Sequence, residues 1–242
     1  MYYAGVGVEA EVGILTSWYD KVSRLINSDE LARLTLELVR IPSPTREELE
    51  VAKFYARTLE QIGLDVTLEY VEENRPNVIA KLPGDGTGGN LLFFGHMDTV
   101  PLGGCSSPRI GEGCVYGRGS CDMKGSLASI AQAMKAIVQS RTKLRGDVYV
   151  AGHVGHESPQ GSGEGIQAIA RKIREGKLKA AAAVNVEGPM DRIKIAQGGS
   201  SMFAVSIANK SGAQYSATSS LRSNPILWTA EVIKNLERID KG

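Results

Sequence analysis

Histidine and acidic residues follow the ends of several predicted strands. The apolar runs at 91–94, 148–154 and 181–186 each read as a strand, and each leads into residues that can bind a metal ion or move a proton. The residues after the strands are His96, Asp98, His156, Glu157 and Glu187, and Asp122 lies at the start of a predicted helix. In open α/β sheets ligands bind at the carboxyl ends of the strands. We therefore expect these side chains to gather at one edge of the sheet.

Such a cluster favours a bound cation. Asp122, Glu157 and Glu187 would repel one another if packed together, and loss of water would raise their pKa values unless a positive charge compensates. A carboxylate and imidazole set suits Zn²⁺ and also Mn²⁺ or Co²⁺, whereas an all-oxygen set would favour Mg²⁺ or Ca²⁺. Taken singly, Asp122 can be a helix cap, Glu187 a solvated turn residue and His96 a buried, hydrogen-bonded histidine. Their coincidence at one edge favours the metal.

Asp98 stands two residues after His96. At this spacing the carboxylate can lie behind the imidazole, fix its tautomer and strengthen it as a donor. Asp98 is therefore expected to support a ligand rather than to be one. The remaining histidine, His153, lies in the same segment as His156, so all three histidines of the chain belong to these strand ends.

Helices alternate with these strands. Amphipathic spacing predicts helices from Glu11 with a restart capped around Ser28, from about Thr45 to Gln61, and over 124–138, 166–175 and 225–238. Further strands are predicted at 65–70, 77–81 and 200–207. Thr45 is expected to cap its helix, and Gly63 to end it. The alternation predicts an α/β fold, a sheet with helices packed on it.

The composition excludes several classes of protein. The 28 Lys and Arg residues nearly balance 27 Asp and Glu residues, which argues against a dedicated nucleic-acid binder. No stretch approaches the roughly 20 apolar residues of a membrane span, and the acidic N-terminus does not read as a signal peptide, so we expect no membrane partner and a cytoplasmic location. Cys105, Cys114 and Cys121 lack paired spacing and read as free thiols.

Two longer motifs carry a family resemblance. Residues 94–101 (FGHMDTVP) and 117–125 (GRGSCDMKG) resemble the M20 metallopeptidases, the group that contains acetylornithine deacetylase, succinyl-diaminopimelate desuccinylase and glutamate carboxypeptidase. Residues 157–165 look most like the deacetylase branch, and the resemblance extends from about Asp29 to the end of the chain. It implies a mixed central sheet flanked by helices, as in zinc exopeptidases, and hydrolysis of an amide or peptide bond.

The resemblance also implies a role for each residue. His96 would bind one metal ion, Asp122 would bridge two ions, Glu187 would complete the first position and Glu157 would hold the second. The expected cofactor is Zn²⁺ at two positions, with Co²⁺ or Mn²⁺ as alternatives. A water bound there would become a hydroxide nucleophile near neutral pH. The implied substrate is an N-acyl amino acid or a small peptide, and a homodimer is a further expectation.

The chain departs from the family pattern at two site positions. Where members carry a glutamate general base immediately before Glu157, this chain has His156. Imidazole can transfer protons near pH 7, but it would gain positive charge beside two cations, so His156 is either the catalytic base or a spectator in an impaired site. Where members use a histidine to bind substrate, spacing back from Pro225 places Tyr215, whose phenol donates a hydrogen bond without positive charge.

The resemblance divides the chain into two parts. Residues 1–197 would be the N-terminal part of a catalytic domain, and residues 198–242 the beginning of an inserted lid or dimerisation domain. Complete members return from the lid to the catalytic domain, where a late histidine supplies the last metal ligand. Two hypotheses stay open: a metal-dependent hydrolase, or a truncated or catalytically impaired homologue that binds a metal or a partner without turnover.

Overall fold

The computed structural model describes residues 18–157, 161–187, 205–208 and 224–239. Its contacts divide the chain into two units, Met1–Asp191 and Arg192–Gly242. The domain boundary expected at 197/198 lies outside the described residues, so the division into a catalytic domain and the start of a lid stays a prediction.

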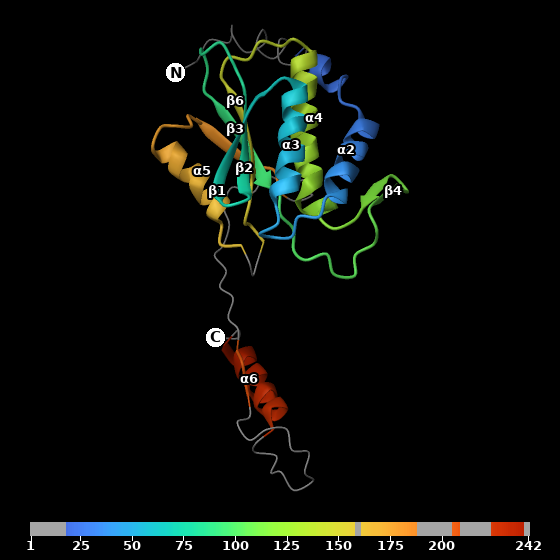
Figure 1. Cartoon of the computed structure of the whole chain (residues 1–242), viewed down its shortest axis with the longest axis vertical. Helices are drawn as coiled ribbons and strands as arrows, with labels where there is room; N and C mark the ends of the chain where they lie inside the picture. Colours follow the sequence, from blue (N-terminus) through green and yellow to red (C-terminus); the bar gives the residue numbers. More distant parts are fainter. Residues whose placement is uncertain (1–17, 158–160, 188–204, 209–223, 240–242) are drawn as a thin grey trace, which may run out of the picture. The chain divides into compact units, whose positions relative to one another are not determined.

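The first unit is built on a five-stranded mixed sheet (Figure 1). Its strands are β1 (Asp65–Glu72), β2 (Arg75–Leu82), β3 (Leu91–His96), β6 (Val148–His153) and β7 (Ala182–Asn185), in the order β1-β2-β6-β3-β7. Strands β6, β3 and β7 are parallel, whereas β2 is antiparallel to both β1 and β6. The register places His96 beside His153, so the carboxyl ends of the parallel strands meet at one edge. The predicted α/β class with a mixed sheet is confirmed.

Helices cover both faces of this sheet (Figure 1). They are α2 (Ser28–Arg40), α3 (Leu49–Ile62), α4 (Gly125–Gln139) and α5 (Glu164–Arg174). Helices α2, α3 and α4 share one face, where Tyr55 and Leu127 are buried in the same core as Val150. Helix α5 lies on the other face, where Ile169 packs against Leu92 in a smaller core. The sheet is thus enclosed between two layers, and its edge at the strand ends carries the polar residues.

Helices α4 and α5 begin and end within two residues of prediction, whereas α3 begins at Leu49 rather than near Thr45. The start of the helix predicted from Glu11 lies outside the described residues, of which 18–23 are helical.

Two caps also differ from prediction. Asn27, not Ser28, caps α2, because its side chain accepts two N–H groups of the first turn at 3.0 Å each. Thr45 does not cap α3: its hydroxyl donates instead to the Asp98 carboxylate at 2.7 Å. Gly63 ends α3 as predicted, with φ of 104°, a left-handed conformation that favours glycine.

Two strand predictions are revised, and one hairpin was not predicted. The run at 181–186 was predicted as a buried strand, but β7 is an edge strand and its side chains are exposed in the described part of the chain. A two-stranded hairpin, β4 (Arg109–Gly111) and β5 (Cys114–Tyr116), was not predicted from its short, glycine-flanked runs. Of the strand predicted at 200–207, residues 205–207 are described and form no strand, and the remainder lies outside the described residues.

The second unit contains α6 (Pro225–Ile239), which agrees with the predicted helix at 225–238. The side chain of Asn224 accepts the N–H of Ile226 at 2.9 Å and so caps the first turn. Among the described residues of the whole chain, every helix falls short of the length and apolar character that a membrane span requires.

A buried ion pair ties the start of α3 to β2. The side chains of Arg75 and Glu48 are 4% and 0% exposed, and Nε and Nη2 of the guanidinium donate to the two carboxylate oxygens at 2.9 and 2.8 Å. Glu164, at the start of α5, makes a further ion pair with Arg75. Glu48 also accepts the N–H of Gly155 at 3.2 Å. The network therefore reaches the segment that carries His156.

Replacing Arg75 should be costly. Arg75→Met leaves the Glu48 carboxylate buried without its partner, so we expect a loss of about 3–5 kcal/mol in the free energy of unfolding, measured by urea denaturation followed by circular dichroism. Arg46→Met is the matched control, because Arg46 pairs with Glu72 at 3.4 Å with side chains 58% and 45% exposed. Its effect should stay below about 1 kcal/mol. Equal losses would contradict the role given to burial.

Glu164 should make stability depend on acid pH. Burial would raise the pKa of Glu164, but hydrogen bonds from Ser162 and the contact with Arg75 outweigh burial and lower the pKa from 4.5 to about 2. A carboxylate with a lowered pKa in the folded chain contributes stability above its unfolded pKa and loses that contribution as the pH falls. The difference in unfolding free energy between the native chain and Glu164→Gln should therefore shrink between about pH 5 and pH 2. A difference independent of pH would contradict this assignment.

Candidate metal centre

The strand ends bring together five of the residues selected from the sequence. Ligand atoms of His96, Asp122 and Glu157 all lie within 4.8 Å of one another. His96, His156 and Glu187 form a second group within the same distance. Only His96 belongs to both groups. These side chains come from the ends of β3, β6 and β7 and from the turn before α4, so the parallel strands assemble the cluster.

The ring of His96 has a defined orientation. Its Nδ1 lies 2.9 Å from the backbone carbonyl of Asp98, and since a carbonyl oxygen only accepts, Nδ1 carries a hydrogen. Its Nε2 faces Oδ1 of Asp122 at 3.0 Å. In the neutral ring this nitrogen presents a lone pair to a carboxylate that also presents lone pairs, so the contact needs a proton or a metal cation to be favourable. The donor pair therefore fits a metal site.

Asp122 lies in the turn Ser120–Lys124, before α4. Its backbone is extended, with φ of −128° and ψ of 95°, and no side chain caps α4. Asp122 is therefore not a helix cap, contrary to the alternative reading of the sequence. The side chain of Asp122 is 58% exposed, so solvent or an ion can reach it. Its carboxylate faces His96.

Asp98 supports the cluster, but differently from the prediction. Its carboxylate lies 3.6 Å from Nδ1 of His96, beyond hydrogen-bond distance, and the backbone carbonyl of Asp98 takes the expected place behind the ring. The buried carboxylate instead accepts the backbone N–H groups of His156 at 3.0 Å and Glu157 at 2.9 Å, and the hydroxyl of Thr45. One residue thus holds both the His96 ring and the segment that follows β6.

The electrostatics of the cluster are unfavourable for carboxylates alone. Burial, and then the negative charge of Asp122, raise the pKa of Glu157. Both causes weaken when a cation lies between the carboxylates, because the cation compensates the lost hydration and the mutual repulsion. This shift and the lone-pair contact at His96 are independent indications that the residues present fit a divalent metal ion.

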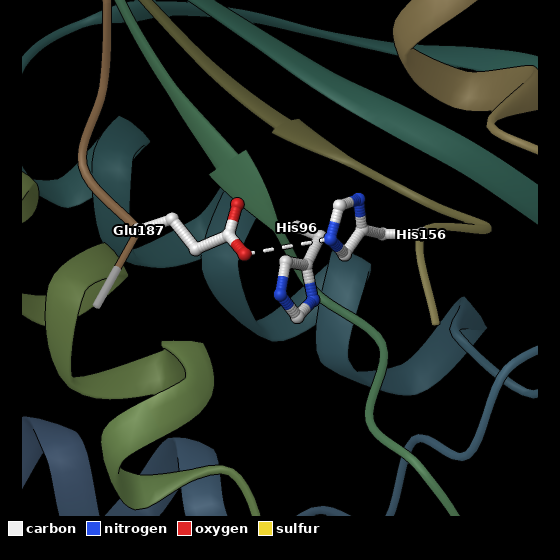
Figure 2. Close-up of side chains that lie close together, drawn as sticks. All are labelled: His96, His156 and Glu187. Atoms are coloured by element: carbon white, nitrogen blue, oxygen red, sulfur yellow. Dashed lines mark ion pairs between the residues drawn. The ribbon is translucent and has the colours of Figure 1, made fainter. Parts of the chain in front are cut away.

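His156 and Glu187 face each other beside His96 (Figure 2). Nε2 of His156 lies 3.5 Å from Oε1 of Glu187, and the two side chains are 38% and 36% exposed. The His156 ring stacks on the His96 ring, with centroids 4.4 Å apart and planes at 18°. Glu187 also accepts a hydrogen bond from the side chain of Asn185 at 2.9 Å. His156 therefore belongs to the cluster rather than to open solvent.

The third histidine is structural. His153 is buried beside His96, with ring centroids 6.2 Å apart, and its Nδ1 has no hydrogen-bond partner among the described residues. Burial, reinforced by the neighbouring His96 and His156, lowers its pKa to about 4. His153 is therefore neutral at pH 7 and fills space beneath the cluster.

Several supporting residues were not predicted. Thr45 contacts Asp98, and Glu48 contacts Gly155. The partners are more than 50 residues apart in each case, so no local spacing indicates these contacts. Gly155 adopts φ of 73°, and a Cβ there would collide with the carboxylate of Glu164. A glycine directly before two polar residues after a strand was the only available signal. Tyr215 lies outside the described residues, and its predicted role in substrate binding stays a prediction.

Known sequences resemble this chain over part of their length. The family model described as Peptidase family M20/M25/M40 matches residues 92–239, more than half of the chain. A succinyl-diaminopimelate desuccinylase from Gluconacetobacter diazotrophicus is 37% identical over 124 residues, which are 48% of this chain and 32% of the relative. A relative from Staphylococcus epidermidis is 27% identical over 222 residues, 88% of this chain and 52% of its own length. The chain thus spans about a third to a half of these relatives.

Solved structures share the fold. Human carnosine dipeptidase 1 superposes with a TM-score of 0.60 at 21% identity, covering 69% of this chain and 40% of that protein. A metallo-carboxypeptidase of the M20 family from Sulfolobus solfataricus has a TM-score of 0.56 at 23% identity, covering 64% of this chain and 37% of that protein. At these identities the likeness concerns the fold alone.

Added Zn²⁺ or Co²⁺ should raise the melting temperature of the chain, measured by thermal scanning. An ion present at 100 times its Kd stabilises the folded state by about 2.7 kcal/mol. His96→Ala should abolish the shift, because His96 belongs to both ligand groups. Glu112→Ala, which removes an exposed carboxylate outside both groups, should retain it. Should the shift persist in His96→Ala, the ion binds elsewhere.

Proposed function

Because the chain belongs to peptidase family M20/M25/M40, we propose that it acts as a metal-dependent hydrolase of amide or peptide bonds, with N-acyl amino acids or small peptides as substrates. The observation that carries this proposal is the approach of His96, Asp122 and Glu157 to within 4.8 Å of one another at the strand ends. One imidazole and two carboxylates from three separate segments meet there, and Glu187 lies in the adjoining group.

The proposed cofactor is Zn²⁺ at two positions, and Co²⁺ or Mn²⁺ suit the same donors. His96 and Glu187 would hold one position, Glu157 the other, and Asp122 would contribute to both. Divalent ions bound in this way lower the pKa of a bound water and polarise an amide carbonyl. The fit of the donors rests on the contact of His96 Nε2 with Asp122 Oδ1 at 3.0 Å and on the raised pKa of Glu157.

The remaining residues orient these donors. The backbone carbonyl of Asp98 keeps a hydrogen on Nδ1 of His96, which leaves Nε2 as the donor atom. The carboxylate of Asp98 holds the backbone of His156 and Glu157, so both side chains are presented from one fixed segment. Preorganised donors cost little reorganisation during the reaction, which is the main way in which a protein scaffold contributes to hydrolysis.

His156 occupies the position where the family resemblance expects a glutamate base. As a proton acceptor, its Nε2 would become positively charged, and the carboxylate of Glu187 at 3.5 Å would stabilise that charge. The same nitrogen can instead donate its lone pair to a metal ion.

The substrate class follows from chemistry shared by the relatives. The matched family is a peptidase family, and one relative is named a succinyl-diaminopimelate desuccinylase. Peptidases cleave peptide bonds and removal of a succinyl group from an amine cleaves an amide bond, so both names support an amide carbonyl as the reacting group. A homodimer and a cytoplasmic location are further proposals that rest on the sequence.

Hydrolysis is tested by release of free amine. The Zn²⁺- or Co²⁺-loaded chain should release amino groups, detected with fluorescamine, from at least one member of a panel of N-acetyl amino acids, N-succinyl amino acids and dipeptides. Asp122→Asn, which keeps the size of the side chain but removes its charge, should abolish release. Asp65→Asn is the matched control, because Asp65 is an exposed aspartate at the start of β1.

The outcome also separates the two hypotheses from the sequence. A chain that binds the ion but releases no amine from any member of the panel would contradict the hydrolase proposal. It would then favour a metal-binding homologue without turnover.

A further inference from the structure

Lys124 is a buried lysine that has no part in the proposed reaction. It ends the turn Ser120–Lys124, two residues after Asp122, and it is 1% exposed. Its Nζ donates to the backbone carbonyls of Leu38 and Ile41 at 3.0 and 2.6 Å. These carbonyls belong to the last turn and the C-cap of α2, where backbone carbonyls lack partners within the helix. The ammonium therefore satisfies the end of α2, and the negative end of the helix dipole stabilises its charge.

Asp122 depends on its neighbours for a fixed position. Its own side chain is 58% exposed, and its backbone dihedral angles are not helical. The next two residues are buried, since Met123 is 0% and Lys124 1% exposed. Sδ of Met123 accepts the N–H of His96 at 3.1 Å, and the N–H of Lys124 donates to the carbonyl of Gly119 at 2.8 Å. The turn is therefore held by the residues that follow Asp122, and Lys124 connects it to α2.

Residues 41–45, which follow α2, contain no proposed ligand but contact the strand end that carries His96. The hydroxyl of Ser43 donates to the carbonyl of Met97 at 2.8 Å. The carbonyl of Ser43 accepts the N–H of Thr99 at 2.9 Å, and the carbonyl of Thr99 accepts the N–H of Thr45 at 3.1 Å. Two prolines restrict the backbone of this segment further. The 41–45 segment is thus a rigid partner of the residues that follow His96.

Lys124 ties the Asp122 turn to the same segment. The shorter of its two hydrogen bonds is accepted by Ile41, the first residue of the 41–45 segment. Its stem also lies close to the strand end, because a Cβ on Gly119 would meet Cδ of Lys124 at 3.2 Å and Cγ2 of Thr99 at 2.8 Å. The turn of Asp122 and the strand end of His96 therefore share one support, and Lys124 is the link on the side of Asp122.

The two donor atoms need such a support. Nε2 of His96 and Oδ1 of Asp122 lie 3.0 Å apart, and groups that bind one ion must stay within about 0.5 Å of their working positions. An exposed carboxylate in an irregular turn meets this requirement only when its backbone is held.

From these contacts we propose that Lys124 is a positioning residue of the metal centre, which holds the Asp122 turn against the 41–45 segment and so sets the separation of Asp122 from His96. The inference rests on the proposed metal centre and function. It adds to them a buried cation that acts through Asp122 rather than on the ion or the substrate.

Metal affinity tests this role without reliance on activity. Co²⁺ binding to the full chain is measured by competition with a chromophoric chelator for the native protein and for Lys124→Met, which keeps an unbranched apolar stem but removes the ammonium. We expect Lys124→Met to weaken binding about tenfold or more, since residues behind metal ligands contribute about 10- to 100-fold. Lys135→Met is the matched control and should bind as the native chain does, because Lys135 pairs with Glu30 at 2.6 Å in a partly exposed contact between α4 and α2.

A double variant separates positioning from general stability. If Lys124 acts through Asp122, the losses of affinity in Lys124→Met and Asp122→Asn should not add when the two are combined. Leu38→Ala opens a cavity at the same end of α2 but keeps the carbonyl that binds Lys124, so it should retain the native affinity. The absorption spectrum of bound Co²⁺ reports its ligands and should change in Lys124→Met but not in Leu38→Ala.

Each outcome bears on a stated proposal. Additive losses, native affinity and spectrum in folded Lys124→Met, or an equal loss in Leu38→Ala would overturn the role of Lys124 and leave the metal centre in place. Circular dichroism verifies folding, and Lys124→Gln, which keeps a donating amide, replaces Lys124→Met if that variant does not fold and should also weaken the ion. Failure of both variants to fold would assign Lys124 to the fold alone and overturn the inference. Absence of Co²⁺ binding in the native chain would instead overturn the metal centre itself.

Discussion

The buried carboxylate of Asp98 is the contact on which the centre depends. Removing a carboxylate from water is unfavourable unless hydrogen bonds replace its hydration, and here the hydroxyl of Thr45 and two backbone N–H groups supply them. The satisfied charge joins the end of β3 to the segment after β6. Because the carbonyl of the same residue orients His96, a single position governs both the ring and the residues that face it.

A second buried charge network, built on Glu48 and Arg75, contacts the same segment. Glu48 binds Arg75 through two hydrogen bonds and also accepts the N–H of Gly155, the residue before His156. The segment after β6 is thus held by two carboxylates, those of Glu48 and Asp98. Rigid support of this kind matters for a centre built from separate strands, since donor positions that vary by 1 Å lose much of their affinity for an ion.

Much of the site was predictable because parallel strands end together. The apolar runs that became β3, β6 and β7 fixed the common edge, and the polar residues after them had to meet there. The sequence could not reveal how the supporting contacts are distributed. A spacing of two residues lets either the carboxylate or the carbonyl of Asp98 lie behind His96, and only the three-dimensional fold selects the carbonyl. Thr45 had an equally good local role as a cap, which a contact 53 residues away displaced.

Strand β7 lies at an edge of the sheet and also precedes a candidate metal ligand. It is one of the two edge strands of the described sheet, its side chains are exposed, and Glu187 follows it by two residues. In the described part of the chain Glu187 therefore follows a strand that is hydrogen-bonded on one side alone, whereas His96 and His156 follow strands that have a neighbour on each side.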